Sequence, residues 1–408
     1  MKRYQWMGIM LSLVLLLCSC GTDKEVEKKA GESTSTPSAT ASVTPLISED
    51  EAFSEAEKIV KTMTIEQKVG QMFLVDLLQL DASPSVDGTA YKATDSMKQA
   101  IIDYHLGGVY LTKENIKSQK QTKKLVQNLQ ASVVSGSALY VAVEEDGGGE
   151  SSISAKVEDL KDTGYVTPKE MGQNMTANQI YESGKTIAGE LTKIGINLNL
   201  APVADLASDQ NPSYAMRCLG SDADGVADLL DDFVSGMREG GLSVTLKTFP
   251  GIGNVSADVT ESIAENTDSL MTIRDTNFVP YASGIQAGAD CVMVSNAAYS
   301  KLTVKKVPAF MSQDIVTKLL REELGFDGIV MTSPLNDNVI ENNYTNEFAV
   351  VEAVKAGCDL IVLPGNFKEC YEALITAVEE GRIDEKVINT SVRRILQNKI
   401  QRGILVLE

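Results

Sequence analysis

Eight short apolar runs, separated by longer amphipathic stretches, constrain the fold of this 408-residue chain more than any other feature. Each run is nearly continuous in apolar residues, which is typical of a strand that is buried on both faces. Helical patterns occupy the intervals, for example 177–194, 222–239 and 312–324. Ser312 is the expected N-cap of the last helix and Gly325 its expected end. The eight runs are residues 69–77, 106–112, 138–144, 196–203, 244–250, 291–297, 328–333 and 360–365.

Eight strand–helix repeats predict an α/β fold, a (β/α)8 TIM barrel in a single domain. A doubly wound open sheet is the alternative. That fold normally carries a glycine-rich phosphate turn after its first strand, and no such turn follows Val75. After Ser48 the chain contains no second linker, so we expect residues 49–408 to form one barrel.

The N-terminal residues have the pattern of a secretion signal and not of a folded segment. Two basic residues precede the apolar run 9–17, which ends in Leu-Cys-Ser-Cys and resembles a bacterial lipobox with Cys20 as the lipidated residue. The alternative, an uncleaved anchor helix, is disfavoured because the run is short for a bilayer span. We therefore predict a lipoprotein signal peptide in 1–20, a disordered Ser/Thr/Pro-rich tether in 21–48, and an extracytoplasmic protein anchored to the bacterial membrane.

Composition excludes several kinds of protein. The chain has 37 Lys and Arg against 56 Asp and Glu, a net charge of −19, which repels phosphate backbones and argues against nucleic-acid binding. Its only histidine, His105, precedes the second predicted strand, at the non-catalytic end of a barrel. No metal or other cofactor is predicted. The cysteines of the body have no metal-ligand spacing and are expected to be buried free thiols, with one disulfide as the alternative. They are Cys218, Cys291, Cys358 and Cys370.

Polar residues follow most of the predicted strands, at the end where barrels place their active sites. Several carboxylates and one lysine around a barrel mouth suit a sugar or polyol ligand, whose hydroxyl groups need many donors and acceptors. An acidic residue at the end of a strand can instead be a helix N-cap. The residues are Asp76, Glu144, Asp146, Asp205, Lys247, Asn296 and Ser333.

Several longer motifs occur in the order found in one known family. On these motifs the chain resembles glycoside hydrolase family 3, in particular its bacterial β-N-acetylhexosaminidase branch, which trims cell-wall amino sugars. The resemblance extends from about Met63 to Leu405. The motifs are MTIEQKVGQMF (63–73), INLNLAPVADL (196–206), MRCLGSD (216–222), KTFPGIG (247–253), PAFMSQDIVTKLLREELGFDGIVMT (308–332), VKAGCDLIVLP (354–364) and GRIDEKVINTSVRRIL (381–396).

The resemblance implies a retaining glycosidase site, in which one carboxylate attacks the anomeric carbon and a second group protonates the leaving oxygen. In this branch the nucleophile is the aspartate after the threonine of the seventh strand, and that position is Ser333 here. The second group is a histidine paired with an aspartate on a loop. The aspartate matches Asp258, but the histidine position is Thr260. Neither hydroxyl group supplies this chemistry near neutral pH without a base. Asp337 and Glu261 are the candidate substitutes.

The resemblance also identifies sugar-binding positions. Two histidines of the family signature are replaced by Thr248 and Ile252, and the acidic run after the third strand lacks the family's arginine. Arg217 and Lys247 have a structural alternative, as ion-pair partners of Asp205. The candidate substrate-binding residues are Glu144, Asp146, Asp205, Arg217 and Lys247.

Three functions agree with these observations. The first is a surface lipoprotein whose barrel has lost hydrolysis and binds an amino-sugar glycan, a muropeptide or a surface protein. The second is an active β-N-acetylglucosaminidase with relocated carboxylates, such as Asp337 with Asp258 or Glu261. The third is a solute-binding lipoprotein, although one barrel lacks the two lobes of that class. The joint loss of nucleophile and histidines favours the first.

Overall fold

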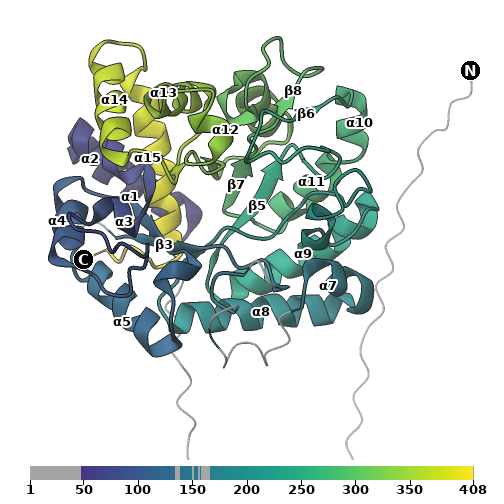
Figure 1. The fold of residues 1–408 in the computed structure, drawn as a ribbon, viewed down its shortest axis with the longest axis horizontal. Helices are drawn as coiled ribbons and strands as arrows, with labels where there is room; N and C mark the ends of the chain where they lie inside the picture. The colour runs from purple at the N-terminus through teal and green to yellow at the C-terminus, as the bar shows by residue number, and fades with distance from the viewer. Residues whose placement is uncertain (1–46, 134–137, 149–150, 155–156, 158–165, 408) are drawn as a thin grey trace, which may run out of the picture. The chain divides into compact units, whose positions relative to one another are not determined.

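The computed structural model describes residues 47–133, 138–148, 151–154, 157 and 166–407. Eight parallel strands form one sheet, and an isolated bridge between Met331 and Leu360 joins the two ends of the strand order. The sheet is therefore a nearly closed barrel (Figure 1). In spatial order the strands are β10 (Ile361–Val362), β1 (Phe73–Asp76), β2 (Gly108–Tyr110), β3 (Tyr140–Val143), β4 (Leu198–Asn199), β5 (Ser243–Phe249), β7 (Cys291–Val294) and β9 (Ile329–Thr332).

The (β/α)8 barrel expected from the sequence is confirmed, and the open-sheet alternative is wrong. Each strand overlaps one of the eight apolar runs, with β5 beginning one residue earlier than expected. Neighbouring strands pair in parallel register, with Val75 opposite Val109 and Val109 opposite Val141. All three valines are fully buried, as the continuous apolar pattern requires.

Helices surround the barrel, and most of them begin at a Ser, Thr, Asp or Asn whose side chain accepts a hydrogen bond from the first helical turn. The α-helices are α1 (Glu49–Thr62), α2 (Ile65–Gln71), α3 (Leu77–Leu80), α4 (Asp95–Asp103), α5 (Gln119–Gln130), α7 (Pro168–Asn174), α8 (Ala177–Lys193), α9 (Ala223–Glu239), α10 (Leu270–Asp275), α11 (Phe278–Gln286), α12 (Asn338–Glu341), α13 (Asn346–Ala356), α14 (Phe367–Glu379) and α15 (Glu385–Gln401). Shorter or irregular turns are η1 (Lys113–Asn115), η3 (Tyr214–Arg217), η4 (Ala309–Met311) and the π-helix η5 (Asp314–Glu323).

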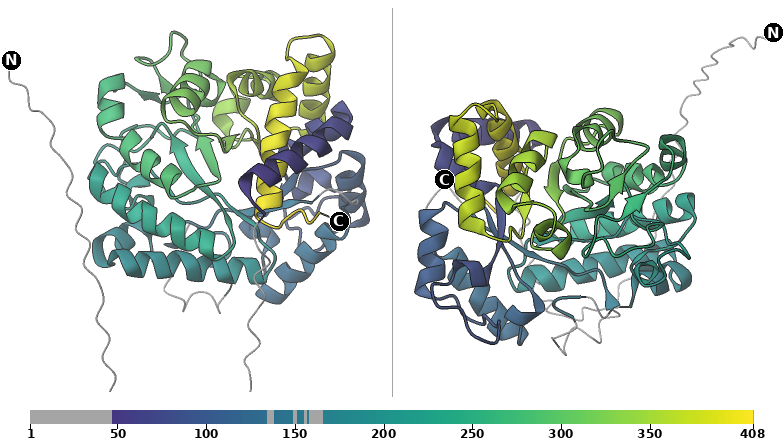
Figure 2. Two further views of the ribbon diagram at one scale, coloured as in Figure 1. Left: turned by 180° about the vertical axis from the view of Figure 1, so that it is seen from behind. Right: turned by 45° about the horizontal axis from the view of Figure 1, so that its top comes forward.

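The first and last helices of the barrel lie side by side. Figure 2 shows α1 along α15, and the two helices are in contact although they come from opposite ends of the domain. Helices α8 and α9 form a second adjacent pair. The predicted helices 177–194 and 222–239 correspond to α8 and α9.

The predicted N-cap of η5 is wrong by one residue. Gln313 occupies the cap position without a side-chain bond, because Ser312 ends the preceding turn η4 and accepts from the helix only through its backbone carbonyl. Gly325 follows the helix as predicted, with a φ of +69° that favours glycine.

Two further features concern the cysteines and the predicted N-terminal segment of the sequence. The four cysteines of the body are buried free thiols, so the disulfide alternative is wrong. Among the described residues no helix is both long enough and apolar enough to cross a bilayer. The predicted signal segment, Cys20 and most of the predicted tether lie outside the described residues.

Candidate functional site

A cavity of about 710 Å³ lies at the C-terminal ends of the strands. Glu144 follows β3, Lys247 belongs to β5 and Ser333 follows β9, so barrel closure brings residues from distant parts of the chain to one mouth. Most of the predicted site residues therefore meet at one place. The lining includes Tyr110, Glu144, Tyr214, Arg217, Lys247, Thr248, Asp258, Thr260, Asn296, Ser333 and Asp337.

Two cations and two carboxylates form a closed network on one wall of this cavity. Lys247 Nζ lies 2.6 Å from Glu144 Oε1 and 2.9 Å from Asp146 Oδ1. The Arg217 guanidinium bonds to the same two carboxylates, with Nε 2.9 Å from Asp146 Oδ2. Lys247 and Asp146 are 3% and 1% exposed, so this ion-pair network is largely desolvated.

The network fixes the charge of Glu144. Burial alone would raise the pKa of its carboxyl group, but the charges of Lys247 and Arg217 outweigh burial and lower that pKa to about 2. Glu144 is therefore an anion at all physiological pH values and does not serve as a proton donor. The structural alternative predicted that Arg217 and Lys247 form ion pairs with Asp205. That prediction is wrong, because both cations pair with Glu144 and Asp146.

Asp205 contacts residues that line the cavity and, within the described part of the chain, accepts hydrogen bonds only from neutral donors. Its carboxylate accepts from the backbone N–H groups of Thr248 and Ile252 at 3.1 and 3.0 Å. The hydroxyl groups of Tyr214, Tyr281 and Thr248 complete five bonds, at 2.8–3.0 Å. Asp205 is fully buried, and this burial raises the pKa of its carboxyl group. The residue thus positions the loop after β5 and is not among the residues that line the cavity.

The two positions that the resemblance assigns to catalysis, Ser333 and Thr260, hold neutral hydroxyl groups. One is bonded to a backbone carbonyl group and the other to a carboxylate on an exposed loop. Ser333 Oγ donates to the carbonyl oxygen of Val294 at 2.9 Å, and the serine is 5% exposed. Thr260 Oγ1 donates to Asp258 Oδ1 at 2.7 Å on the exposed loop. Among the described residues Ser333 has no carboxylate, amine or imidazole partner that could remove its proton.

The candidate substitutes Asp337 and Glu261 occupy different surroundings. Asp337 lines the cavity and accepts from Asn296 Nδ2 at 2.8 Å. Burial raises the pKa of its carboxyl group to about 7, and repulsion by Asp258, Glu144 and Glu261 adds to this effect. Glu261 instead accepts from Asn338 at 3.0 and 3.1 Å at an exposed position. Asp337 is therefore the carboxyl group of the cavity that can hold a proton near neutral pH.

The structure also places Asp76 and His105, which the sequence analysis discussed, and two tyrosines that it did not. Asp76 caps α3, because its carboxylate accepts from Leu78 N–H at 2.7 Å. His105 lies before β2 and is not part of the cavity lining, as expected. The sequence reasoning missed Tyr110, which donates to Glu144 at 3.4 Å, and Tyr214. Tyr214 lies two residues before the start of the matched motif 216–222, which was the available signal.

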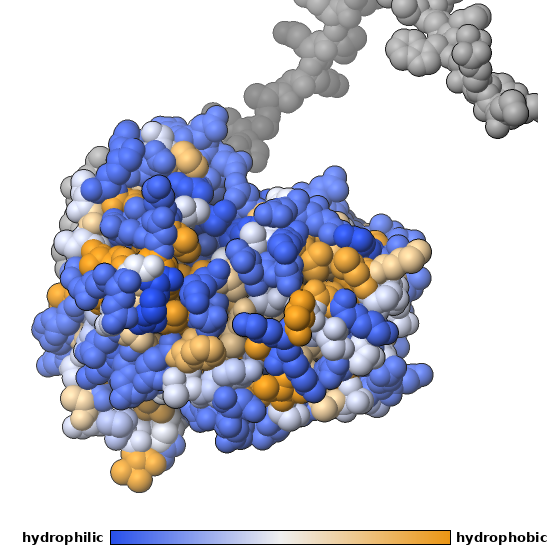
Figure 3. Space-filling view, turned by 90° about the horizontal axis from the view of Figure 1, so that it is seen from above, coloured by the Kyte–Doolittle hydropathy of each residue, from blue (hydrophilic) through white to orange (hydrophobic). Residues whose placement is uncertain are grey.

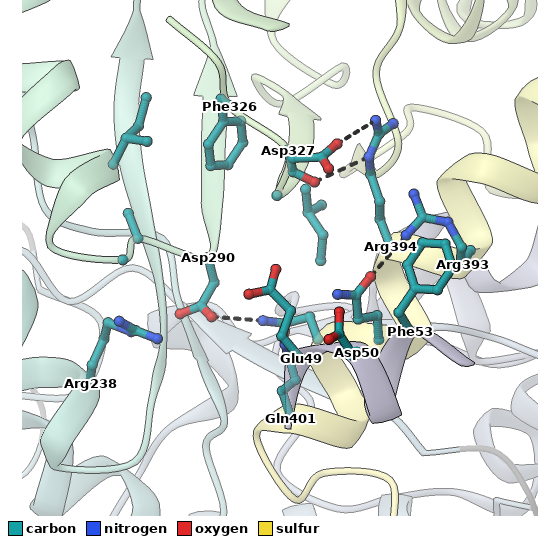
Figure 4. Close-up of a pocket in the computed structure, with 17 residues that line it drawn as sticks. Glu49, Asp50, Phe53, Arg238, Asp290, Phe326, Asp327, Arg393, Arg394 and Gln401 are labelled. Carbon is teal, nitrogen blue, oxygen red and sulfur yellow. Dashed lines mark hydrogen bonds and ion pairs between the residues drawn. The ribbon is translucent and has the colours of Figure 1, made fainter. Parts of the chain in front are cut away.

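A second cavity, of about 490 Å³, lies at the N-terminal ends of β7 and β9 (Figure 4). Among the described residues, three of its charged side chains, Asp290, Asp327 and Arg394, form ion pairs. Arg394 lies 3.0 Å from Asp327, and Asp290 binds Arg402 at 2.8 Å. Arg393 stacks over the ring of Phe53 at 4.4 Å. None of the predicted site residues lines this cavity, and in the described ranges no three His, Cys, Asp or Glu residues are grouped to hold a metal ion.

Comparison with known proteins agrees with this arrangement. Residues 64–398 match the model of the glycosyl hydrolase family 3 N-terminal domain. The chain belongs to glycoside hydrolase family 3. The match covers most of the chain and confirms the resemblance seen in the motifs.

Relatives of this glycoside hydrolase family 3 chain include enzymes named for amino-sugar hydrolysis. It is 26% identical to "Beta-hexosaminidase A" of Pseudoalteromonas piscicida, over 83% of this chain but only 61% of that protein. A family 3 β-N-acetylglucosaminidase structure from Paenibacillus sp. str. FPU-7 is 29% identical with a TM-score of 0.76, over 85% of this chain and 64% of that one. The β-N-acetylhexosaminidase structure from Beutenbergia cavernae DSM 12333 is 29% identical with a TM-score of 0.72, over 83% and 98%.

Proposed function

We propose that this family 3 chain binds an amino-sugar glycan or muropeptide in its barrel mouth and has lost most of the hydrolytic activity. The observation that carries the proposal is the bonding of Ser333 and Thr260. Both hydroxyl groups occupy the positions of the family's reacting groups, and neither can ionise near neutral pH. The cation–carboxylate network around Lys247, by contrast, is complete and lines an open cavity of ligand size.

The test uses the chain 21–408, 4-nitrophenyl N-acetyl-β-glucosaminide and cell-wall muropeptides, with product release followed for hours. We expect no release above that of a Ser333→Ala control, together with saturable binding of N-acetylglucosamine oligosaccharides or muropeptides. Glu144→Gln should weaken that binding, because it removes the charge that holds both cations. Turnover that is unchanged in Ser333→Ala would contradict the loss of hydrolysis.

A second candidate function, an active β-N-acetylglucosaminidase, is favoured by one observation. Asp337 lines the cavity and its carboxyl pKa of about 7 suits a general acid at neutral pH. Asp258, which also lines the cavity, would then have to act as the second carboxylate. In the same assay this function requires turnover that is abolished by Asp337→Asn and retained by Ser333→Ala.

A protein partner is the remaining alternative for the ligand. The face shown in Figure 3 is mostly hydrophilic, and its apolar side chains lie in separate patches. This face gives no specific argument for a protein-docking surface. Failure of all glycan and muropeptide binding, with the chain folded, would favour this alternative.

We also propose that the protein is an extracytoplasmic lipoprotein of a bacterium, anchored through lipidated Cys20. The support is the basic start, the apolar run and the Leu-Cys-Ser-Cys ending of the signal segment. We expect radiolabelled fatty acid to be incorporated into the wild-type chain, and the chain to sediment with membranes. A Cys20→Ser variant that still carries the label would contradict lipidation at this residue.

A further inference from the structure

A buried hydrogen-bond acceptor without a partner lies in the wall of the mouth cavity. Asn296 is 2% exposed, and its Nδ2 donates to Asp337 Oδ2. Its other amide atom, Oδ1, is buried and has no hydrogen-bond partner among the described residues. A buried acceptor of this kind is unfavourable until a donor reaches it. Because Asn296 lines the cavity, that donor can come from a ligand.

Three carboxyl groups in or beside the cavity have no neighbouring cation among the described residues. Within those residues Asp258 accepts only from Thr260, through one of its two oxygens, and Asp337 accepts only from Asn296. Glu261, on the adjoining loop, accepts from the neutral amide of Asn338. Within the described residues none of these three carboxyl groups is part of an ion pair.

The cations of the cavity do not compensate this charge. Arg217 and Lys247 are both bound by Glu144 and Asp146, so those four residues together are neutral. Arg217 reaches these carboxylates through Nε and Nη2, and Lys247 through Nζ. The unpaired carboxyl groups therefore leave the cavity with excess negative charge, which attracts a ligand ammonium group but not the neutral acetamide that replaces it in an N-acetylated sugar.

We infer that the barrel mouth prefers amino sugars whose nitrogen is a free ammonium group over the corresponding N-acetylated sugars. The inference rests on the proposed function, since it takes the mouth cavity as the glycan site. Asn296 and Asp337 are in direct contact, so one ammonium group can donate to both, and its charge is attracted by Asp258. The ligand class is thus a partly or fully de-N-acetylated β-linked amino-sugar glycan.

The test compares two probes by titration calorimetry: the β-1,4-linked tetramer of glucosamine and the β-1,4-linked tetramer of N-acetylglucosamine. At about pH 7 the amine of the first probe is mostly protonated, as an α-amino group is, and Asp337 is about half ionised. We expect the glucosamine tetramer to bind about tenfold more tightly, and the Asp258→Asn and Asp337→Asn variants each to reduce this preference about threefold or more. Asp231→Asn, on the exposed side of α9 away from the cavity, is the matched control and should leave the preference unchanged within about twofold.

The outcomes separate this inference from the proposed function. Equal or tighter binding of the acetylated tetramer overturns the inference and leaves glycan binding intact. A preference that persists undiminished in both cavity variants also overturns it, because the general negative charge of the chain would then explain the preference. Binding of neither tetramer overturns the proposed glycan-binding function itself.

Discussion

The side-chain amide of Asn296 donates a 2.8 Å hydrogen bond to the carboxyl group of Asp337 in the barrel mouth. Asn296 follows β7, and Asp337 is the residue before α12. The bond favours the ionised carboxylate, but burial of the group has the larger effect, and the pKa of Asp337 rises to about 7. Near neutral pH this carboxyl group is therefore divided between its two protonation states.

Replacement of Asp337 by Asn should stabilise the protein at alkaline pH more than at acidic pH. The folded-state pKa lies above the unfolded value of about 3.9, so the folded chain binds more protons and the wild type loses stability as the pH rises from about 4 to 7. Three pKa units correspond to about 4 kcal/mol, which partial solvent access reduces to about 2 kcal/mol. Urea unfolding of both proteins at about pH 4.5 and pH 8 measures this difference, and Asp231→Asn is the control. A difference independent of pH would contradict the raised pKa.

Replacement of Asp146 by Asn should destabilise the barrel strongly. The carboxylate is 1% exposed and binds both Lys247 and Arg217, so its loss leaves two largely buried cations with Glu144 alone. We expect the free energy of unfolding to fall by about 2–4 kcal/mol. Asp327→Asn is a matched control, because Asp327 pairs with Arg394 through a side chain that is 87% exposed, and should cost less than about 1 kcal/mol. Similar losses in the two variants would argue against a special role of the buried network.

Replacement of Asp205 by Asn should loosen the loop after β5. Each carboxylate oxygen of Asp205 accepts from one backbone N–H group, Oδ1 from Thr248 and Oδ2 from Ile252. Whichever way an Asn amide is turned, its NH2 group would face one of these donors. We expect a loss of about 2–3 kcal/mol and faster hydrogen exchange at Thr248 and Ile252. Unchanged exchange at both amides would show that Asp205 does not hold this loop.

The strands of the barrel could be predicted because burial on both faces leaves a continuous apolar pattern in the sequence. Cys291–Val294 and Ile329–Thr332 are examples, since every residue of both strands is buried. The small parallel pair β6 (Glu265–Asn266) and β8 (Ala298–Tyr299) was not predicted. Two residues are too few to show a period of any kind.

The members of the candidate site could be predicted better than their contacts. Strand ends and family motifs pointed to Arg217, Lys247 and Glu144, and all three line one cavity. Their pairing could not be predicted, because Glu144 and Lys247 are 103 residues apart and loop geometry decides which carboxylate each cation reaches. The raised pKa of Asp337 could not be predicted from the sequence either, because it depends on burial by residues from other loops.

Lys399 presents a buried amine at the other end of the barrel. It is fully buried on α15, and its Nζ donates to Gln71 Oε1 and to the Gly107 carbonyl oxygen, both at 2.8 Å. The ring of Tyr140 lies beneath it, 4.8 Å from Nζ to the ring centroid. No carboxylate is bonded to it in the part of the chain that the structure describes, and burial lowers the pKa of the amine to about 7.

Replacement of Lys399 by Met should remove a pH-dependent component of stability. The folded-state pKa lies below the unfolded value of about 10.4, so the unfolded chain binds more protons between about pH 7 and 10. The wild type therefore loses stability as the pH falls from about 10 to 7, by at most about 1.4 kcal/mol per pH unit, and loses no more below that range. Urea unfolding of wild type and variant at about pH 7 and pH 9 gives the difference in slope. Lys399→Leu should show the same slope as Lys399→Met, because the slope depends on the lost amine and not on packing. Parallel pH profiles of wild type and both variants would mean that the amine is not buried as a neutral group.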